Sequence, residues 1–367
     1  MAKKATSSQV VLFTGFPGFI GARLLPRLLE LQPEASYRCI VQEKFLGQAK
    51  AAIEQIEDAH AHTRGRIGTV VGDITSERLG LSASDAKALQ KELTGAHHLA
   101  AVYDLAVKRE IGLRINVQGT RNVLEFLQGA RRFERLHYVS TAYVSGTAVG
   151  VYRETDLDVG QSFKNFYEET KFLAEVEVVK SGVPASIYRP GIVVGDSRTG
   201  ETAKFDGPYF ALRAMSRLPS PGAFMKVGSG RNRVNVVPVD FVMEALAQLS
   251  SKPSSENKTY HLTDPDAPTA FEIEEVFARA LGKSFVYVPV PLVLARLFFT
   301  PGPMQKVFGM PVQSVDYFDH PCRYDCSLAT AELERLGVRC PRFLDYAQRL
   351  VAFYREKQDQ VRRSAMI

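Results

Sequence analysis

The sequence predicts an α/β fold in which helices cover both faces of a parallel sheet, followed by a smaller part of mixed α and β structure. In the first half of the chain, short runs rich in Val and Ile alternate with segments that have apolar residues at helical spacing. A glycine-rich turn joins the first of these runs to the first helical segment. Such alternation is typical of doubly wound sheets, whose strands are buried on both faces.

The elements of this first half follow from local composition and spacing. Strands are predicted at residues 10–13, 37–41, 67–71, 99–102, 136–139 and 185–188. Helices are predicted at residues 18–31, 82–93, 108–128 and 163–180. Ser82 and Asp85 have the spacing of a capping box, which supports the start of the second of these helices.

The pattern loosens after Pro190, where Gly, Pro and Ser crowd residues 191–230. Beyond them we expect an apolar run at 234–239, a strand at 259–262, and helices at 241–249, 271–281 and 343–354. The natural division is a nucleotide-binding domain at residues 1–190 and a mainly substrate-binding part at 191–367. Some strands and helices of the second part are expected to return to the first domain.

Composition limits the classes of function. Of the 367 residues 45% are hydrophobic, and 22 Phe and 14 Tyr can build a large core, so the chain is expected to be globular. The net charge of +6 is spread along the sequence without a dense basic stripe, which argues against a nucleic-acid partner. The four cysteines form no metal-ligand spacing, so we expect free thiols and no metal site.

An apolar stretch at residues 286–299 is the most lipid-like part of the chain. Pro289, Pro291 and Arg296 interrupt it well before the ~18 residues that a spanning helix needs. The N-terminal apolar run is too short for a secretory signal and leads straight into the glycine-rich turn. We therefore expect a soluble cytoplasmic protein without a transmembrane segment.

The turn after the first strand contains three glycines at a spacing of three residues. It reads Thr14-Gly15-Phe16-Pro17-Gly18-Phe19-Ile20-Gly21. The first glycine permits the tight turn, the second lets the backbone approach a pyrophosphate, and the third permits close packing of helix on strand. The helix that follows presents unpaired N–H groups to phosphates. The turn therefore predicts a dinucleotide site on a Rossmann-type sheet, with residues 15–20 at the cofactor.

The residue after the second strand usually selects between NAD and NADP, because a carboxylate there binds the ribose hydroxyls and repels a 2′-phosphate. Gln42 occupies this place and does not exclude NADP, Lys44 could attract it, and Glu43 argues the other way. The sequence therefore favours NADP(H) slightly over NAD(H). Asp73 follows the third strand and is placed either to bind the adenine edge or to cap its own turn.

A phenol and an ammonium group lie four residues apart in Tyr167-Glu168-Glu169-Thr170-Lys171, on one face of a predicted helix. The pKa of an ordinary phenol is ~10, and an adjacent cation lowers it, so Lys171 can make Tyr167 a better proton donor. The strand before this helix ends in hydroxyl-bearing residues that could bind a substrate carbonyl. Ser140, Thr141 and Tyr143 are all candidates on local reasoning.

These segments together resemble a known family. TGFPGFIG, GDI, HLAA, NVQGT, VSTAYVSG, YEETK and YRPG occur in the order found in the extended short-chain dehydrogenases/reductases. GDITSERLGLS and VSTAYVSG narrow the resemblance toward the branch of fatty acyl-CoA reductases and carrier-protein thioester reductases. The resemblance covers Val10 to Val239, and the rest of the chain matches only in general pattern.

The resemblance implies roles for individual residues. Thr141 would bind the substrate carbonyl, Tyr167 would donate the proton, and Lys171 would activate Tyr167 and bind the cofactor ribose. Asn116 matches an asparagine that supports a proton-relay water, although an ordinary polar helix residue is an equal alternative. The matching segments also place Ile74, Ala100, Ala101, Pro190, Gly191 and Ile192 along the cofactor.

The expected function is hydride transfer from NAD(P)H to a carbonyl of an apolar, lipid-like or secondary-metabolite substrate. The substrate could be carried on CoA or on a carrier protein. We expect neither the longer C-terminal domain nor the carrier domain of the proteins that the chain resembles, which points to a free aldehyde, ketone or ring carbonyl rather than a thioester. Six apolar residues lie where a substrate lid is expected and are interpreted equally as pocket or core: Phe205, Tyr209, Phe210, Met215, Phe224 and Met225.

Two other classes of function stay open. Sugar-nucleotide epimerases and dehydratases share this fold, but the dehydratases place an acidic pair directly after the carbonyl-binding Thr, where this chain has Ala142 and Tyr143. The third class is a nucleotide-binding regulator without turnover, against which the intact Thr141, Tyr167 and Lys171 set argues. The helices at 108–128 and 163–180 could pair as a dimer seam, so the protein is expected to be a monomer or a homodimer.

Overall fold

The computed structural model describes residues 9–308 and 310–364, which form two compact units. The first unit consists of the chain up to Val144 together with Phe166–Arg189 and Met243–Tyr260. The second consists of Ser145–Asn165, Pro190–Val242 and the chain from His261 onward. The short segment Ser145–Asn165 thus belongs to the second unit although it lies within the first 190 residues of the chain.

A seven-stranded sheet forms the centre of the first unit, with the strand order β11-β7-β5-β4-β1-β2-β3. Its strands are β1 (Gln9–Thr14), β2 (Ala35–Val41), β3 (Ile67–Val71), β4 (Leu93–His98), β5 (Arg135–Val139), β7 (Ala185–Pro190) and β11 (Thr259–Leu262). The strands from β7 to β3 pair in parallel. Leu12, Ala96 and Leu136 of three adjacent strands are completely buried, which places the core against the middle of the sheet.

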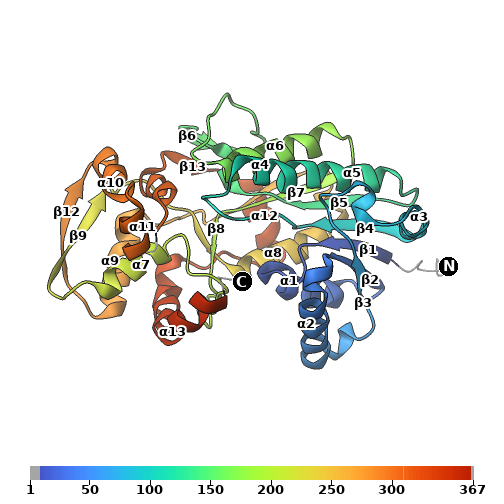
Figure 1. Cartoon of the computed structure of the whole chain (residues 1–367), viewed down its shortest axis with the longest axis horizontal. Helices are drawn as coiled ribbons and strands as arrows, with labels where there is room; N and C mark the ends of the chain where they lie inside the picture. Colours follow the sequence, from blue (N-terminus) through green and yellow to red (C-terminus); the bar gives the residue numbers. More distant parts are fainter. Residues whose placement is uncertain (1–8, 309, 365–367) are drawn as a thin grey trace. The chain divides into compact units, whose positions relative to one another are not determined.

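Helices cover both faces of this sheet, as Figure 1 shows: α4, α5 and α6 lie on one side, and α1, α2 and α8 on the other. Their bounds, with that of α3, are α1 (Phe19–Leu31), α2 (Leu46–Ala59), α3 (Ala83–Glu92), α4 (Arg109–Gly112), α5 (Gly119–Gln128), α6 (Phe166–Lys180) and α8 (Val239–Ser250). Ser82 caps α3 by accepting the Asp85 N–H, as its spacing predicts. The doubly wound parallel sheet expected from the sequence is therefore confirmed.

The fourth strand is displaced from its predicted position. It spans Leu93–His98 instead of residues 99–102. Gly95 and two histidines make this segment a poor strand by composition, but it pairs with β1 on one side and β5 on the other, with Val11 and Arg135 opposite Gly95. Residues 99–102 instead leave the carboxyl end of the strand. Pairing on both sides overrides local propensity here.

Two helices of the first unit also differ from expectation. The predicted helix at 108–128 consists of α4 and α5 joined by a π-helical turn at Leu113–Gln118, which contains Asn116. Such turns are rare and often occur at functional sites. The helix α2 is missing from the sequence-based assignment, although its Ala- and Glu-rich composition suits a helix.

The second unit is built from three small parallel strand pairs and several helices. The pairs are β6 (Gly150–Tyr152) with β13 (Cys322–Tyr324), β8 (Ile192–Val194) with β10 (Val236–Pro238), and β9 (Gly222–Val227) with β12 (Phe285–Val290). The helices are α7 (Tyr209–Arg217), α9 (Ala270–Leu281), α10 (Leu292–Phe299), α11 (Gly302–Phe308), α12 (Ser327–Glu334) and α13 (Phe343–Ser364). The mixed α/β character expected of this part is confirmed.

Membrane and metal features are also addressed by the structure. Within residues 9–308 and 310–364, every helix is too short or too polar to span a bilayer. The same residues contain no cluster of three or more His, Cys, Asp or Glu side chains suited to a metal ion. All four cysteines are free thiols.

Two histidines are stacked in the middle of the sheet. The rings of His97 on β4 and His137 on β5 have centroids 4.5 Å apart, and Phe13 on β1 stacks on His97 at 5.9 Å. Neither ring nitrogen of His97 has a hydrogen-bond partner among the described residues. Burial lowers the pKa of His97 to about 3 and also lowers that of His137. Both imidazoles are therefore neutral at physiological pH.

We expect this stack to destabilise the fold in acid. The pKa of His97 is lower in the folded state than its ordinary value of 6.5, so the unfolded state binds more protons and stability falls as the pH drops from 6.5 toward 3. His97→Leu should remove on the order of 3 kcal/mol of this loss at about pH 4. Urea unfolding at neutral and acidic pH would measure it. The exposed His60→Leu serves as control, and equal acid sensitivity of the two variants would contradict the expectation.

Candidate active site

The glycine-rich turn lies against the carboxyl end of β4. Gly15 has a φ of +92°, and a Cβ on it would lie 2.9 Å from Ala100 N and from the Leu99 carbonyl carbon. A Cβ on Gly18 or on Gly21 would lie 2.7 Å from the Gly15 carbonyl oxygen. Each of the three positions therefore has room only for glycine. The turn is held close to the residues that follow β4, as a phosphate-binding turn requires.

The helix α1 begins directly after this turn with its backbone donors available. Gly18 is its N-cap and contributes no side-chain hydrogen bond, and the first turn carries no acidic residue. The first N–H groups of a helix have no partner within the helix and carry a partial positive charge. Together with the close approach at Gly15, this makes residues 15–20 suited to a pyrophosphate, and their contact with a cofactor stays a prediction.

The second predicted contact region joins the ends of β2 and β3. Gln42 Nε2 donates to Asp73 Oδ2 at 2.9 Å, while Asp73 Oδ1 accepts the Thr75 N–H at 2.8 Å and its hydroxyl at 2.9 Å. Asp73 therefore caps its own turn and binds Gln42. Ile74 is buried and lies against Gly119, where a Cβ would come within 2.8 Å of it. Lys44 is exposed, with its Nζ 4.8 Å from the centre of the Phe45 ring.

Lys171 on α6 lies buried beneath the carboxyl end of β5. Its Nζ donates to the Val139 carbonyl at 2.9 Å and to Tyr138 Oη at 3.0 Å. Burial lowers the pKa of Lys171 to about 8, and the negative charge of Glu175 opposes this shift. Burial also raises the pKa of Tyr138 well above its ordinary value, so its neutral phenol accepts the hydrogen bond. The ammonium group is thus held at the strand end by two protein oxygens.

The structure separates the hydroxyl candidates at the end of β5. Ser140 Oγ donates to Glu175 Oε2 at 2.5 Å, which commits it to the interior. Thr141 Oγ1 accepts the Tyr143 N–H at 3.3 Å, beyond the last residue of the strand. Both Thr141 and Tyr143 are buried, 6% and 4% exposed. Thr141 therefore fits the role of carbonyl binder better than Ser140 does.

Tyr167 lies on α6, one turn before Lys171, and is half-buried. Its ring packs edge-on against Tyr103, with the centroids 5.1 Å apart. Tyr103 belongs to the segment that follows β4, so this contact brings the predicted proton donor to the same sheet edge as the glycine-rich turn. Sequence reasoning missed Tyr103, and its position directly after the HLAA motif is the signal that could have identified it.

Asn116 holds the π-helical turn to both neighbouring segments. Its Oδ1 accepts the Val102 N–H at 2.9 Å, and its Nδ2 donates to Thr170 Oγ1 at 3.0 Å. It is 1% exposed. These contacts fasten the segment after β4 to the turn of α6 between Tyr167 and Lys171. Asn116 thus positions both sides of the site, and its support of a proton-relay water stays a prediction.

A buried charge pair lies below these residues. The Arg189 guanidinium on β7 donates to Glu175 Oε1 through Nη2 at 2.6 Å and through Nε at 3.0 Å. The two side chains are 2% and 0% exposed. Glu175 lies on α6, one turn after Lys171. It therefore connects this helix to the end of β5 through Ser140 and to β7 through Arg189. It was also missed from the sequence, although its i+4 spacing from Lys171 places it on the same helix face.

The remaining predicted cofactor residues lie at two strand ends. Ala100 and Ala101 directly follow β4, and the Ala100 N–H donates to Thr14 Oγ1 at 3.2 Å. Pro190 ends β7 and Ile192 begins β8 in the second unit. Between them, Gly191 donates its N–H to the Leu262 carbonyl at 3.2 Å, and a Cβ on it would lie 2.6 Å from Asn235 O.

Residues 13–246 match the model of an NAD-binding family that is described as "Male sterility protein". A part of a linear gramicidin synthase from Brevibacillus parabrevis is 30% identical over 292 residues, which cover 76% of this chain and 6% of that protein. Fatty acyl-CoA reductase wat from Drosophila melanogaster is 26% identical over 272 residues, 64% of this chain and 53% of that protein. The chain therefore spans from a small fraction to about half of these relatives.

A solved structure is similar over nearly the whole chain. The terminal R domain from the myxalamid PKS-NRPS biosynthetic pathway has a TM-score of 0.78 and is 26% identical, with 96% of this chain and 92% of that chain covered. The likeness extends beyond residue 239, where the sequence motifs end. It confirms the Rossmann-type fold with a smaller C-terminal part.

We expect Glu175 to be a principal contributor to the stability of the first unit. Glu175→Gln should lower the free energy of unfolding by about 3 kcal/mol or more, because Arg189 would keep a buried charge without its partner. Glu177→Gln is the matched control, since Glu177 lies on the same helix and pairs with Arg121 at the surface. Its loss should cost less than about 1 kcal/mol. Equal costs in urea unfolding would show that the buried pair has no special weight.

Proposed function

This chain belongs to the NAD-binding family described as "Male sterility protein", within the extended short-chain dehydrogenases/reductases, and we propose on that premise that it is an NAD(P)H-dependent carbonyl reductase. The membership confirms the family resemblance found in the sequence. The observation that carries the proposal is the buried Lys171 ammonium at the end of β5, one helical turn from Tyr167 and next to the strand end that bears Thr141.

The reduced nicotinamide, when bound, supplies the hydride that adds to the carbonyl carbon. The Thr141 hydroxyl and the Tyr167 phenol stabilise the negative charge that develops on the carbonyl oxygen. Tyr167 then transfers its phenolic proton to this oxygen. The product is the hydroxyl group of an alcohol or, from a thioester, of a hemithioacetal. Positive charge on Lys171 favours the phenolate that remains. The pKa of Lys171 is about 8, so this assistance is present at neutral pH and is lost as the pH rises through that value.

Three features of the chain support a nicotinamide dinucleotide as the cofactor. The turn at Gly15 and Gly18 with the N-terminus of α1 would hold the pyrophosphate, and Lys171 would reach a ribose hydroxyl. We propose NADP(H) as the preferred form, because the place after β2 holds the neutral Gln42. The exposed Lys44 is available to a 2′-phosphate there, while Glu43 opposes it.

The proposed substrate is a thioester or aldehyde with an apolar, lipid-like or secondary-metabolite body. The relatives include a fatty acyl-CoA reductase and a linear gramicidin synthase, and the similar solved structure is a terminal R domain of a PKS-NRPS pathway. These names favour an acyl group carried on CoA or on a carrier protein. Free thiols at all four cysteines also support the proposal of a reducing, cytoplasmic location.

Loss of the proton donor provides the test of the proposed reaction. Tyr167→Phe should lower kcat with acyl-CoAs or long-chain aldehydes by a factor of about 100 to 10,000, while the affinity for NADPH changes little. The absorbance change on oxidation of NADPH measures kcat, and fluorescence titration measures the affinity for NADPH. Tyr103→Phe is the matched control, because it removes a phenol hydroxyl beside Tyr167 and keeps the ring contact. It should lower kcat far less than Tyr167→Phe does. Cofactor binding without turnover of any carbonyl by the wild type would favour the epimerase or regulator alternatives.

The cofactor preference has a separate test. Lys44→Glu should raise the KM for NADPH about tenfold, because it replaces an attraction to the 2′-phosphate by a repulsion, and it should leave the KM for NADH unchanged. Parallel kinetics with the two cofactors on one aldehyde measure the difference. Lys50→Glu is the control, since Lys50 is exposed on α2 and makes the same change of charge. Equal changes for NADPH and NADH would contradict the assignment.

A further inference from the structure

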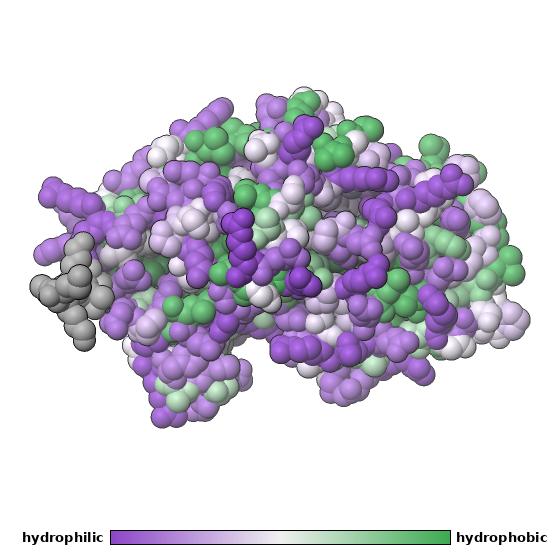
Figure 2. All heavy atoms as spheres, turned by 180° about the vertical axis from the view of Figure 1, so that it is seen from behind, coloured by the Kyte–Doolittle hydropathy of each residue, from purple (hydrophilic) through white to green (hydrophobic). Residues whose placement is uncertain are grey.

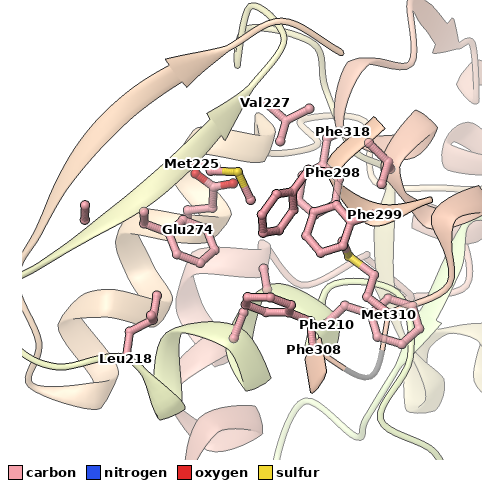
Figure 3. Close-up of a pocket in the computed structure, with 15 residues that line it drawn as sticks. Phe210, Leu218, Met225, Val227, Glu274, Phe298, Phe299, Phe308, Met310 and Phe318 are labelled. Carbon is pink, nitrogen blue, oxygen red and sulfur yellow. The ribbon is translucent and has the colours of Figure 1, made fainter. Parts of the chain in front are cut away.

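The second unit contains an apolar pocket of about 220 Å³. Its walls come from α7, β9, α9, α10, α11 and the 3₁₀ turns at Val312–Asp319. Figure 3 shows Phe210, Phe298, Phe299, Phe308 and Phe318 around it, together with Met225 and Met310. Three residues of the predicted substrate lid, Phe210, Phe224 and Met225, therefore line the pocket. Phe205, Tyr209 and Met215 are buried in a neighbouring core cluster instead.

One side chain in this wall is out of keeping with the rest. Glu274 on α9 lines the pocket and is 2% exposed, and its Oε2 has no hydrogen-bond partner among the residues that the structure describes. In Figure 3 its carboxyl group lies beside Met225, among the apolar side chains. A buried carboxyl oxygen without a partner is costly, and such groups in native proteins call for an explanation. The position of Glu274 points to a ligand that completes its bonding.

The aromatic walls narrow the chemistry of that ligand. Phe298, Phe299 and Phe308 meet edge to face, with centroids 5.1 to 6.0 Å apart and planes 62° to 89° to one another. Aromatic faces attract cations, and boxes of rings are a known way to bind ammonium groups. The nearby Lys226 shows the same preference, since its Nζ lies 4.1 Å from the centre of the Phe271 ring. The phenylalanine rings and the Glu274 carboxyl group together suit a ligand that carries a cationic group on an apolar body.

The pocket also has a route to solvent and a defined capacity. Phe298 is 43% exposed while it lines the pocket, so it lies at the rim. The same helix exposes Val293, Leu294 and Leu297, and Figure 2 shows hydrophobic residues gathered at the edge of the surface where Figure 1 places β9, β12 and α10. A dry cavity of roughly 150 Å³ accepts benzene. A volume of about 220 Å³ therefore accepts a ring with a short chain.

We propose that this pocket binds a small apolar amine, with Glu274 as the counter-ion of its ammonium group and the phenylalanine rings around its apolar body. Burial raises the pKa of Glu274 to about 8, against the opposing charge of Lys226, so the free carboxyl group is mostly protonated at neutral pH. Binding of an ammonium ion ionises this group, and its proton passes to the solvent. The site acts in binding and is separate from the proposed reduction.

The test compares phenethylamine with phenethyl alcohol, which differ only in the group that meets Glu274. Isothermal titration of the full chain should show the amine binding at least tenfold more tightly than the alcohol. Titration in buffers of different ionisation enthalpy should show close to one proton released for each amine bound. Glu274→Gln should reduce amine affinity at least tenfold, abolish proton release and leave alcohol binding unchanged.

Matched variants separate the site from general effects. Glu275→Gln on the same helix changes an exposed carboxylate and should bind the amine as the wild type does. Ala214→Leu fills the pocket and should abolish binding of both probes. Tyr167→Phe should bind the amine normally, which distinguishes this inference from the proposed reaction. Equal affinity for amine and alcohol, unchanged amine binding by Glu274→Gln, or no binding of the amine at millimolar concentration would each overturn the proposal.

Discussion

The buried contact between Glu175 and Arg189 is the constraint on which the candidate site depends. The carboxylate and the guanidinium are both buried, so each needs the other as its counter-ion. Loss of either one leaves a buried charge without compensation. Glu175 also accepts the Ser140 hydroxyl, and so it fixes the end of β5 relative to β7. Because Lys171 lies one turn earlier on the same helix, the charge pair also sets where the ammonium group can lie and supports its charged form.

The sheet order converts this local constraint into a site. The strand β4 lies between β1 and β5, so the residues after it meet the glycine-rich turn on one side and the ends of the β5 and α6 elements on the other. Gly15 approaches Leu99 and Ala100, while Asn116 fastens Val102 to Thr170. Ligands of doubly wound sheets bind at the carboxyl ends of the strands. The contacts of Gly15 and Asn116 lie at that edge of this sheet. The chemistry proposed for Tyr167 and Lys171 follows from their place at that edge.

The second unit contains a buried ionisable group in a different environment. In the first unit, each buried charge near the site has a partner, and the resulting network positions hydroxyl and ammonium groups. In the pocket of the second unit, Glu274 Oε2 is buried without a described partner among phenylalanine and methionine side chains. The same desolvation that makes Lys171 easier to deprotonate makes Glu274 harder to ionise. One environment suits proton transfer and the other suits capture of a cation.

The sequence by itself determined the features that depend on neighbours along the chain. The glycine spacing, the capping at Ser82, the alternation of strands and helices and the i+4 pair at Tyr167 and Lys171 are local, so the parallel fold and its family could be predicted. Tertiary structure decided what depends on residues far apart in sequence. Pairing with β1 and β5 moved the fourth strand to Leu93–His98, since sheet hydrogen bonds outweigh the weak strand propensity of that segment.

The same distinction holds for the sites. Ser140 and Thr141 could not be separated from the sequence, because the carboxylate that commits Ser140 lies on another element, 35 residues further along the chain. The role of Asn116 as a fastening between two segments likewise depends on partners at Val102 and Thr170. Phe210, Met225 and Glu274 carry no shared motif, since a pocket requires only that their side chains meet in space. The sequence therefore predicted the candidate reacting groups, and only the packing of distant elements decided their surroundings.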